Sequence, residues 1–502
     1  MKILLLYPQY PDTFWSFRKS LKFVSKESTS PPLGLLTVAA LLPNEFEKKL
    51  IDMNVDKLTD TDLLWADYVF ISAMITQKDS ANKVIERCKK LGVKTVAGGP
   101  LFMSLHEEFP EVDHFVLNEG EVTVPLFLED LKNDSLKKIY TSDIKPDITK
   151  SPIPQWNLIN IKKYSKMAIQ FSRGCPYDCE FCDIVNLNGR IPRNKTPEQV
   201  INEIESLYKA GWSSSAHSSI FIVDDNFIGN KIKAKELLKA LIDWRIKRKS
   251  RITFITEVSL NLADDEELLS LMRDAGFDTV FIGLETPSKE SLQECGKFQN
   301  KNRDQTLSVR KIQSYGMEVT GGFIVGFDSD DFSIFARQIE FIQKTGIVVA
   351  MVGLLQALPG TKLYERLKRE NRLLVKGSSG NNTDFSTNFL PKMDPAILIN
   401  GYKNILSSVY SPENYYKRVK TFLEHYKPCH KEDFKLKDLK ALIKSICILG
   451  IFKENRKYYW EIFFTCLFKY PGSFSKAITM TVYYEHFKTI FASPPKSLKL
   501  SF

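Results

Sequence analysis

The segment RGCPYDCEFCDI, residues 173–184, places Cys175, Cys179 and Cys182 within eight positions. The chain has 8 cysteines in 502 residues, and the other five are scattered singly, unlike a secreted disulfide scaffold. Soft thiolates on a short loop can ligate three irons of a 4Fe-4S cluster, which leaves the fourth iron open. A zinc site, a disulfide with a spare thiol, and reactive surface cysteines are the alternatives. Structural zinc needs four ligands, and a disulfide would leave one of the three thiols over.

Apolar runs alternate with helical periodicity from the first residue to about residue 355, an order typical of α/β proteins. The first block predicts a doubly wound parallel sheet, whose ligand site lies outside the carboxyl ends of its strands. A helix is expected from Asp79 to Leu91, ended by Gly92. The strands predicted for this block are 2–7, 68–73, 94–97 and 114–117.

A second series of strands and helices follows a proline-rich stretch at 140–156. Six such units predict a partial or full TIM-like barrel, with its chemistry where the strands end. The cysteine segment follows the first of these strands directly. The predicted barrel strands are 167–172, 219–224, 252–258, 279–284, 319–325 and 348–355. The predicted division is a first domain at 1–140, a linker at 141–165, a barrel at 166–375 and a mainly helical region at 376–502, which begins with a loop at 376–384.

The chain is long enough for two or three domains, and 43% apolar residues suffice to form their cores. Its net charge of +10 is dispersed among acids, so we expect no nucleic-acid partner. No signal peptide or membrane span is recognisable, which favours a cytoplasmic protein. The aromatic helices beyond residue 390 are expected mainly in a core. A hydrophobic substrate lid or a membrane-surface helix near 453–470 is the alternative.

The spacing C-x3-C-x2-C, with Phe181 just before the third cysteine, resembles the radical S-adenosylmethionine (SAM) superfamily. In that family the open iron chelates the amino and carboxylate groups of SAM, and an electron from the cluster cleaves SAM to a 5′-deoxyadenosyl radical. The resemblance implies that Cys175, Cys179 and Cys182 bind the metal cluster and form the catalytic centre.

Polar residues at the ends of four barrel strands extend this resemblance, in FIVDDNF, FITEVSLN, FIGLETP and GGFIVGF. A carboxylate that closes an apolar strand is costly unless it is paired or solvated, so these groups are expected at the barrel mouth. A helix N-cap at 224–226 and a packing glycine at 321–327 are the alternatives. The predicted SAM-site residues are Phe181, Asp224, Asp225, Asn226, Glu257, Ser259, Glu285 and Gly322.

A doubly wound domain ahead of such a barrel resembles the cobalamin-binding branch of the superfamily. The segments FISAMITQ, TVAGGPL and LNEGEVTVPLF carry this resemblance at three strand ends. The sequence D-x-H-x-x-G, whose histidine ligates cobalt in many cobalamin proteins, is absent, so the lower axial ligand stays open. A protein-docking or regulatory domain is the alternative. The predicted cobalamin-site residues are Ser72, Thr76, Gly98, Gly99, Glu119 and Gly120.

Nearly the whole chain is similar to the subgroup that carries a helical carboxyl-terminal region and includes the hopanoid methylases. The resemblance implies a cobalamin-dependent methyltransferase that acts on an unactivated carbon of a small substrate. A hydrophobic or lipid substrate is compatible with this resemblance. The resemblance also implies an electron donor such as flavodoxin or ferredoxin, and it leaves peripheral membrane contact open. Rearrangement, ring contraction or cyclisation without net methylation is the alternative, and a non-catalytic cobalamin or iron-sulfur protein is a more distant one. A methylthiotransferase would need three amino-terminal cysteines, and residues 1–150 contain only Cys88.

Overall fold

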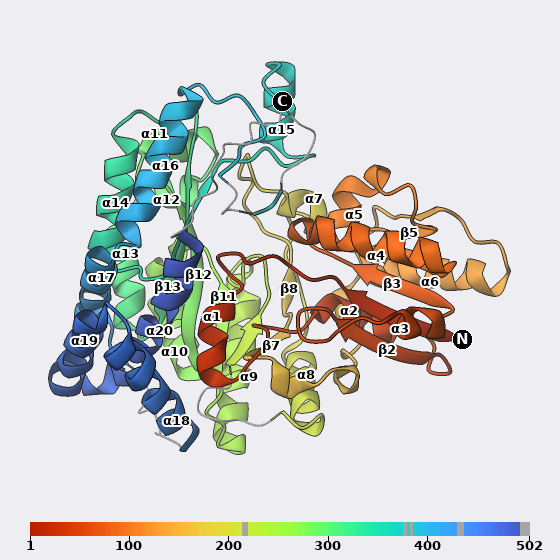
Figure 1. The fold of residues 1–502 in the computed structure, drawn as a ribbon, viewed down its shortest axis with the longest axis horizontal. Helices are drawn as coiled ribbons and strands as arrows, with labels where there is room; N and C mark the ends of the chain where they lie inside the picture. Colours follow the sequence, from red (N-terminus) through yellow and green to blue (C-terminus); the bar gives the residue numbers. More distant parts are fainter. Residues whose placement is uncertain (213–218, 375–378, 382–384, 429–435, 492–502) are drawn as a thin grey trace.

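The amino-terminal part of the chain is a six-stranded, all-parallel sheet in the order β2-β1-β3-β4-β5-β6 (Figure 1). The computed structural model describes residues 1–212, 219–374, 379–381, 385–428 and 436–491. Strand β1 carries four consecutive buried residues, as expected for a parallel strand that is covered on both faces. The strands are β1 (Lys2–Tyr7), β2 (Glu47–Asp52), β3 (Tyr68–Ser72), β4 (Lys94–Gly98), β5 (His114–Val116) and β6 (Ile139–Tyr140).

Helices cover both faces of this sheet, as the sequence predicts for a doubly wound domain. The helix expected from Asp79 is present one residue longer, and it ends at Gly92 with φ 68°, a left-handed conformation that suits glycine. The helices are α1 (Arg18–Leu21), α2 (Leu33–Leu41), α3 (Asp60–Trp65), α4 (Lys78–Leu91), α5 (Pro100–Leu105) and α6 (Gly120–Lys132).

A second six-stranded parallel sheet, in the order β14-β13-β12-β11-β10-β7, forms the central partial barrel. The predicted fold class is thereby confirmed. The strands are β7 (Lys166–Ile169), β10 (Ser219–Ile222), β11 (Thr253–Glu257), β12 (Phe277–Glu285), β13 (Glu318–Val325) and β14 (Ala350–Leu354). The helices are α8 (Pro197–Lys209), α9 (Lys231–Arg248), α10 (Glu266–Ala275), α11 (Lys289–Glu294), α12 (Phe298–Lys301), α13 (Gln305–Ser314) and α14 (Ile334–Thr345).

Four strands were not predicted as separate strands. β2 is an edge strand with the sequence EKKLID, whose lysines hide the apolar alternation, and β6 has only two residues. β8 (Ser172–Arg173) and β9 (Arg193–Asn194) form an antiparallel pair. This pair closes the base of the loop that carries the three cysteines.

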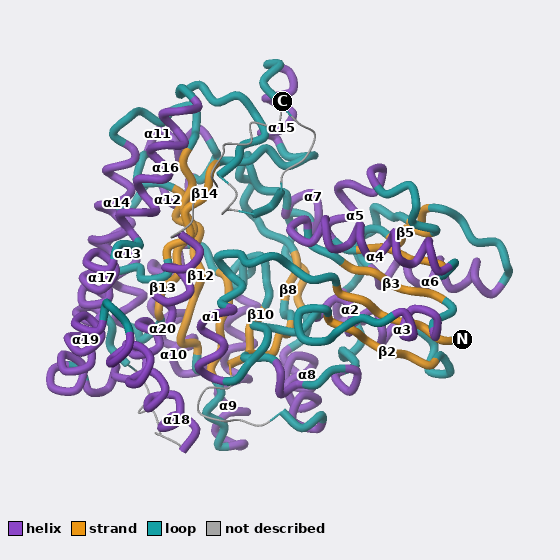
Figure 2. Tube along the Cα trace, in the orientation of Figure 1, coloured by secondary structure: helices purple, strands orange, loops and turns teal. Residues whose placement is uncertain are grey.

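The carboxyl-terminal helices pack along the open side of the barrel (Figures 1 and 2). They are α16 (Pro395–Val409), α17 (Pro412–His425), α18 (Leu436–Ser445), the π-helix η8 (Ile446–Phe452), α19 (Arg456–Lys469) and α20 (Phe474–Phe491). α15 (Lys362–Arg369) lies apart from them, against the cysteine loop (Figure 1). The amino-terminal segment joins them, because Ser20 Oγ donates to the Val482 carbonyl at 3.1 Å and α1 packs on α20. Within the described part of the chain, no helix is both long and apolar enough to cross a bilayer.

The predicted domain limits stay a prediction. The first sheet ends with β6 at Tyr140, and the barrel sheet begins with β7 at Lys166. Most of the loop predicted at 376–384 lies outside the described residues.

Candidate active site

The three clustered cysteines lie on the loop between β8 and β9, just past the carboxyl end of β7. All three are free thiols and half-buried. The Cys175 amide donates to the Gly189 carbonyl at 3.2 Å. Gly174 has φ 100°, and a Cβ there would lie 2.9 Å from that same carbonyl oxygen, so the turn requires glycine. The two ends of the cysteine loop, at residues 174–175 and at Gly189, therefore lie in direct backbone contact.

One ammonium group acts on all three thiols. Burial raises the pKa of Cys175 and Cys179, and it raises the pKa of Cys182 to about 12, while the positive charge of Lys297 opposes this at each sulfur. A lysine so placed favours thiolates, the form that binds iron. Among the described residues no three His, Cys, Asp or Glu side chains could share a single metal ion. Each thiolate of an iron-sulfur cluster binds its own iron, so this spacing does not count against a cluster.

Lys297 forms a buried ion pair with Glu285, the last residue of β12. Glu285 has φ 63°, a conformation that non-glycine residues rarely adopt. Gly283 makes room for the pair, because a Cβ there would lie 2.6 Å from Lys297 Nζ. Burial alone would lower the pKa of Lys297, but Glu285 and Cys179 hold it above its ordinary value. The sequence analysis found Glu285 and missed Lys297, which follows the strand by twelve positions and carries no motif of its own.

Asp224 and Asp225 hold the ends of the cysteine loop. Asp224 accepts hydrogen bonds from the Phe171 amide at 2.8 Å and from Ser172 Oγ at 2.7 Å. Burial raises the pKa of Asp224 to about 7. Asp225 accepts from the Gly174 amide at 2.7 Å. Both carboxylates therefore position the loop, and their predicted contact with SAM stays a prediction.

A chain of polar side chains leads from β10 and β11 to the first cysteine. Asn226 Nδ2 lies 3.9 Å from Cys175 Sγ and donates to Ser259 Oγ at 3.2 Å. Ser259 Oγ donates to Asn261 at 2.6 Å, and Asn261 donates to the Tyr177 hydroxyl at 2.9 Å. Asn226 and Ser259 were predicted site residues. Asn261 and Tyr177 were missed, although both lie within segments that the sequence analysis singled out.

Three further predicted SAM-site residues have separate surroundings. Glu257 lines the cavity described below, and burial followed by the charge of Asp225 raises its pKa to about 7. Gly322 lies against Phe281, since a Cβ there would be 2.8 Å from the ring. Phe181 packs 6.3 Å from Phe327, measured between ring centroids. Packing explains the last two positions, and their SAM contacts stay predictions.

A cavity of about 1280 Å³ joins the first sheet to the interior of the barrel. Thr76, Met74 and Gln77 line it beyond β3, and Tyr7 and Tyr10 line it at and beyond the end of β1. A single ligand pocket typically measures about 300–1,000 Å³. The cavity therefore has room for a bulky cofactor and a further molecule, and it lies where a doubly wound sheet binds ligands.

The glycine pair predicted to surround cobalamin is packed tightly by its own sheet. A Cβ at Gly98 would lie 2.6 Å from the Val116 carbonyl oxygen. Gly99 has φ 86°, and a Cβ there would lie 2.6 Å from Ser72 Oγ. The edge of the sheet thus tolerates no side chain at either position. Of the cobalamin-site residues predicted from the sequence, Thr76 lines the described cavity.

Glu119 and Glu121 bind the cysteine loop to the first domain through buried ion pairs. Glu119 accepts from Arg173 at 2.6 Å and from Arg193 at 2.7 Å. Glu121 pairs with Arg173 at 2.8 Å, and this contact outweighs burial and lowers the pKa of Glu121 to about 2. The Glu119 carboxylate, predicted at the cobalamin site, is thus engaged in this interdomain clamp. Gly120 begins α6 between the two acids. Contact of Glu119 or Gly120 with cobalamin stays a prediction.

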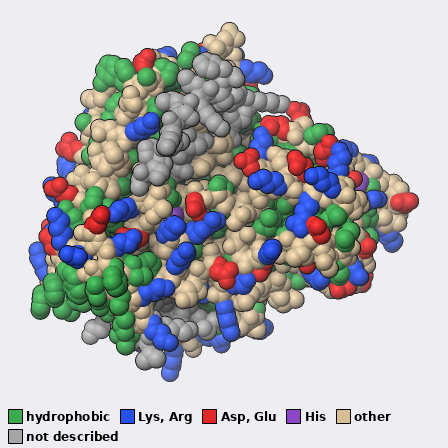
Figure 3. All heavy atoms as spheres, viewed as in Figure 1, with side chains coloured by type: hydrophobic (Ala, Val, Ile, Leu, Met, Phe, Trp, Pro, Cys, Tyr) green, Lys and Arg blue, Asp and Glu red, His purple; other side chains and the backbone are tan. Residues whose placement is uncertain are grey.

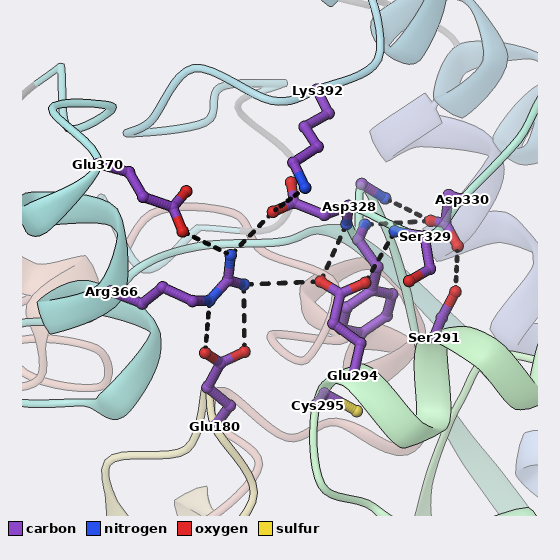
Figure 4. Close-up of polar contacts among 12 residues, drawn as sticks. Glu180, Ser291, Glu294, Cys295, Asp328, Ser329, Asp330, Arg366, Glu370 and Lys392 are labelled. Carbon is purple, nitrogen blue, oxygen red and sulfur yellow. Dashed lines mark hydrogen bonds and ion pairs between the residues drawn. The ribbon is translucent and has the colours of Figure 1, made fainter.

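A second ion-pair network fixes the other side of the cysteine loop (Figure 4). Arg366 of α15 donates to both oxygens of Glu180, with 2.6 Å from Nε and 3.2 Å from Nη2. Its Nη1 bonds Asp328 beyond β13 at 2.8 Å. The Glu180 amide donates to the Cys295 carbonyl at 2.9 Å. Because Glu180 lies between the second and third cysteines, the network orients the thiols.

Three family models match successive parts of the chain. Residues 23–128 match the B12 binding domain, residues 169–342 match the Radical SAM superfamily, and residues 361–497 match a domain of unknown function (DUF4070).

Curated proteins match over most of the chain. An uncharacterized methyltransferase of Synechocystis sp. is 42% identical over 493 residues, which cover 97% of this chain and 91% of the relative. The hopanoid C-2 methylase of Rhodopseudomonas palustris is 36% identical, over 84% of this chain and 80% of the relative. A radical S-adenosylmethionine methyltransferase from Kitasatospora setae, solved with cobalamin and a 4Fe-4S cluster, has the same fold, with a TM-score of 0.63 at 14% identity over 96% of this chain and 98% of that one.

Proposed function

Since the chain belongs to the cobalamin-binding radical SAM family of enzymes, in the subgroup that includes hopanoid C-2 methylase, we propose that it methylates an unactivated carbon of a small, hydrophobic substrate. Enzymes of this family use a 4Fe-4S cluster, SAM and cobalamin. One observation carries the proposal. The cavity that begins beyond the carboxyl ends of β1 and β3 in the first sheet continues into the barrel, where it passes Glu257, a predicted SAM-site residue that lines it.

The residues present fit the three cofactors. Cys175, Cys179 and Cys182 would hold three irons, with Lys297 beside them to balance the negative charge of the thiolates. When bound, the cofactors supply a 5′-deoxyadenosyl radical that removes a hydrogen atom and a methyl group that replaces it. The chain itself positions the substrate and excludes water. Glu257, with a pKa of about 7, can hold or release a proton in this cavity near neutral pH.

We propose that the substrate is a lipid and that the enzyme contacts a membrane surface. Hydrophobic side chains gather over α19 at the lower left of Figure 3. Phe452 and Phe468 are 81% and 80% exposed there. The apolar face, as we call it, consists of Leu439, Ile443, Ile451, Phe452, Phe464, Leu467 and Phe468.

Two observations favour a lipid surface as the partner of the apolar face. The exposed lysines Lys440, Lys444, Lys457 and Lys469 lie among its residues in the sequence, and such cations complement anionic headgroups. The face and the cavity share α18, since Ala441 and Leu442 of that helix line the cavity.

Reduction of the cluster needs an external electron donor, and we propose flavodoxin or ferredoxin for this role. Rearrangement, ring contraction or cyclisation without net methylation is the second candidate. It uses the same cofactors, and a relative named as a cyclase supports it: the anaerobic magnesium-protoporphyrin IX monomethyl ester cyclase of Synechocystis sp., at 25% identity over 68% of this chain.

Anaerobic reconstitution followed by a comparison of lipids tests the proposal. The protein should bind about four irons and form 5′-deoxyadenosine from SAM, and the triple variant Cys175→Ala, Cys179→Ala, Cys182→Ala should do neither. Lipid extracts of cells with and without the gene should differ by compounds one CH2 unit heavier. A product of unchanged carbon count would favour the second candidate, and a triple variant that retains its iron would reject the cluster assignment.

A further inference from the structure

The cysteine loop is packed against other elements on three sides. Arg173 joins it to the first domain and Glu180 joins it to α15, both through ion pairs. From a third side, Gln299 of α12 places its Nε2 4.0 Å from the sulfur of Cys179. The outer side of the loop instead carries the exposed side chain of Ile191. This outer side is accessible to another molecule.

The outer side has an apolar part. Ile191 is 81% exposed, and Pro192 follows it directly. A Cβ at Gly229 would lie 3.1 Å from Pro192 and 3.2 Å from Pro176, so the residues that lead into α9 pack against the loop here. Ile232, in the first turn of α9, is 72% exposed. The two prolines and two isoleucines give this part of the surface an apolar character.

Two cations border the apolar part and share one carboxylate. Arg190 and Lys362, the first residue of α15, both form ion pairs with Asp178. The side chains of Arg190 and Lys362 are 56% and 63% exposed, whereas that of Asp178 is 28% exposed. Arg190 also donates to the Pro176 carbonyl at 3.4 Å, which places it beside the prolines. The outermost charges are therefore positive.

The other charged groups nearby do not cancel this positive charge. Most of them are matched in pairs: Lys231 and Lys235 with Asp265 and Glu267, Lys233 with Glu236, and Arg303 with Asp264. α15 has four basic residues and one acid among its eight, and the whole chain has a net charge of +10. Because complementary charge speeds the encounter of two proteins and selects the right partner, the surface fits an acidic partner.

The docking face, as we call it, comprises Pro176, Asp178, Arg190, Ile191, Pro192, Ile232 and Lys362. It adjoins two of the three cluster cysteines, because Cys175 directly precedes Pro176 and Cys179 directly follows Asp178. Electron transfer between proteins needs the two redox groups to lie close together. An apolar centre within a polar rim is typical of protein interfaces, and electron-transfer complexes have small ones.

We propose that the docking face binds the protein that reduces the cluster, a small acidic flavoprotein whose flavin edge is exposed. This inference rests on the proposed function, which needs an external electron donor, and it assigns that donor a surface. The apolar edge of the flavin ring would meet the isoleucines, and the acids around it would meet Arg190 and Lys362. One electron passes from the reduced flavin to the cluster, so the flavin is oxidised, the cluster is reduced and no covalent bond changes.

The test follows reduction of the anaerobically reconstituted protein by reduced flavodoxin, with stopped-flow absorbance at low salt. Ile191→Asp places a negative charge in the face and leaves the ion pairs of Asp178 in place. We expect reduction of this variant to be about tenfold slower, because like charges then meet at the interface. The matched control is Ile246→Asp, 71% exposed and about 21 Å along α9 from Ile232, which should keep the rate.

A second variant, Arg190→Gln with Lys362→Gln, removes the two outermost cations. Its reduction by flavodoxin should also be slower, and the rate should fall less steeply with added salt than that of the unmodified protein. Dithionite, a small reductant that needs no docking face, should reduce every variant at the same rate.

Three results would overturn the inference. Equal flavodoxin rates for Ile191→Asp and Ile246→Asp would show that the donor binds elsewhere. Slower reduction of Ile191→Asp by dithionite as well would show that the change acts on the cluster itself. A dependence on the face for reduced ferredoxin but not for flavodoxin would exclude the flavoprotein. These measurements use no substrate, so failure to detect a methylated product would count against the proposed function and leave the docking face standing.

Discussion

Glu121→Gln should expose how strongly the interdomain clamp stabilises the protein. Glu121 is 10% exposed and binds Arg173, which lies two positions before the first cluster cysteine. Its pKa falls from an ordinary 4.5 to about 2. Each pKa unit corresponds to about 1.4 kcal/mol, so the ionised side chain contributes about 3 kcal/mol to the free energy of unfolding.

The pH dependence has a defined sign. Because the pKa is lowered in the folded state, the contribution is complete above about pH 5 and is lost as the pH falls toward 2. The variant should therefore be about 3 kcal/mol less stable than the unmodified protein at pH 7, and about half of this difference should remain near pH 3. In the variant Arg173 keeps Glu119 as its partner, so no buried charge is left alone.

Urea unfolding at pH 7, 5 and 3, followed by both fluorescence and circular dichroism, measures these differences. The matched control is Glu129→Gln on the same helix, whose side chain is exposed and which should change stability by less than about 0.5 kcal/mol. Identical pH profiles for the two variants would refute the assigned role of the clamp. A difference that grows as the pH falls would contradict the sign.

Three further changes probe the other parts of the molecule. Phe452→Asp with Phe468→Asp should reduce cosedimentation with anionic vesicles by about tenfold or more. The control Ile246→Asp, at a residue 71% exposed on α9, should leave cosedimentation unchanged. An equal loss in both variants would show that the apolar face is not the membrane contact. Arg366→Lys keeps the charge but loses the two-pronged bond to Glu180, so a chelator should remove iron from the reconstituted cluster several-fold faster, and an unchanged rate would show that the network does not orient the loop. Thr76→Trp, at a residue that lines the cavity beyond β3, should lower cobalamin content at unchanged iron content, and unaltered cobalamin would contradict the placement of that site.

Buried strands and the cysteine loop were predictable from the sequence, because their signals lie within a few neighbouring residues. Ile3 and the three consecutive leucines of β1, like the apolar strands of the barrel, are typical of a buried parallel sheet. The cysteine spacing is local as well, because its geometry is set within one loop. Edge strand β2 was not predictable in this way, since three of its six residues are charged before its first buried leucine.

Contacts between distant segments could not be predicted. Asp224 and Asp225 were expected at the ligand because they follow a strand, yet backbone amides of the cysteine loop take up their oxygens. Nothing near Glu119 indicates that arginines more than fifty residues away, at 173 and 193, will bind it. In each case a polar residue follows a strand, as predicted. Its bonding partner depends on packing between distant segments, which no local sequence pattern encodes.

Buried ion pairs hold the cysteine loop from two sides. A short loop that carries three thiols has little apolar core of its own, and charge pairs take the place of one. Arg173 ties its amino end to the first domain, and Arg366 ties its middle to α15. Charge pairs of this kind have directional bonds, so they can fix the thiols and the first domain relative to each other without filling the space between them.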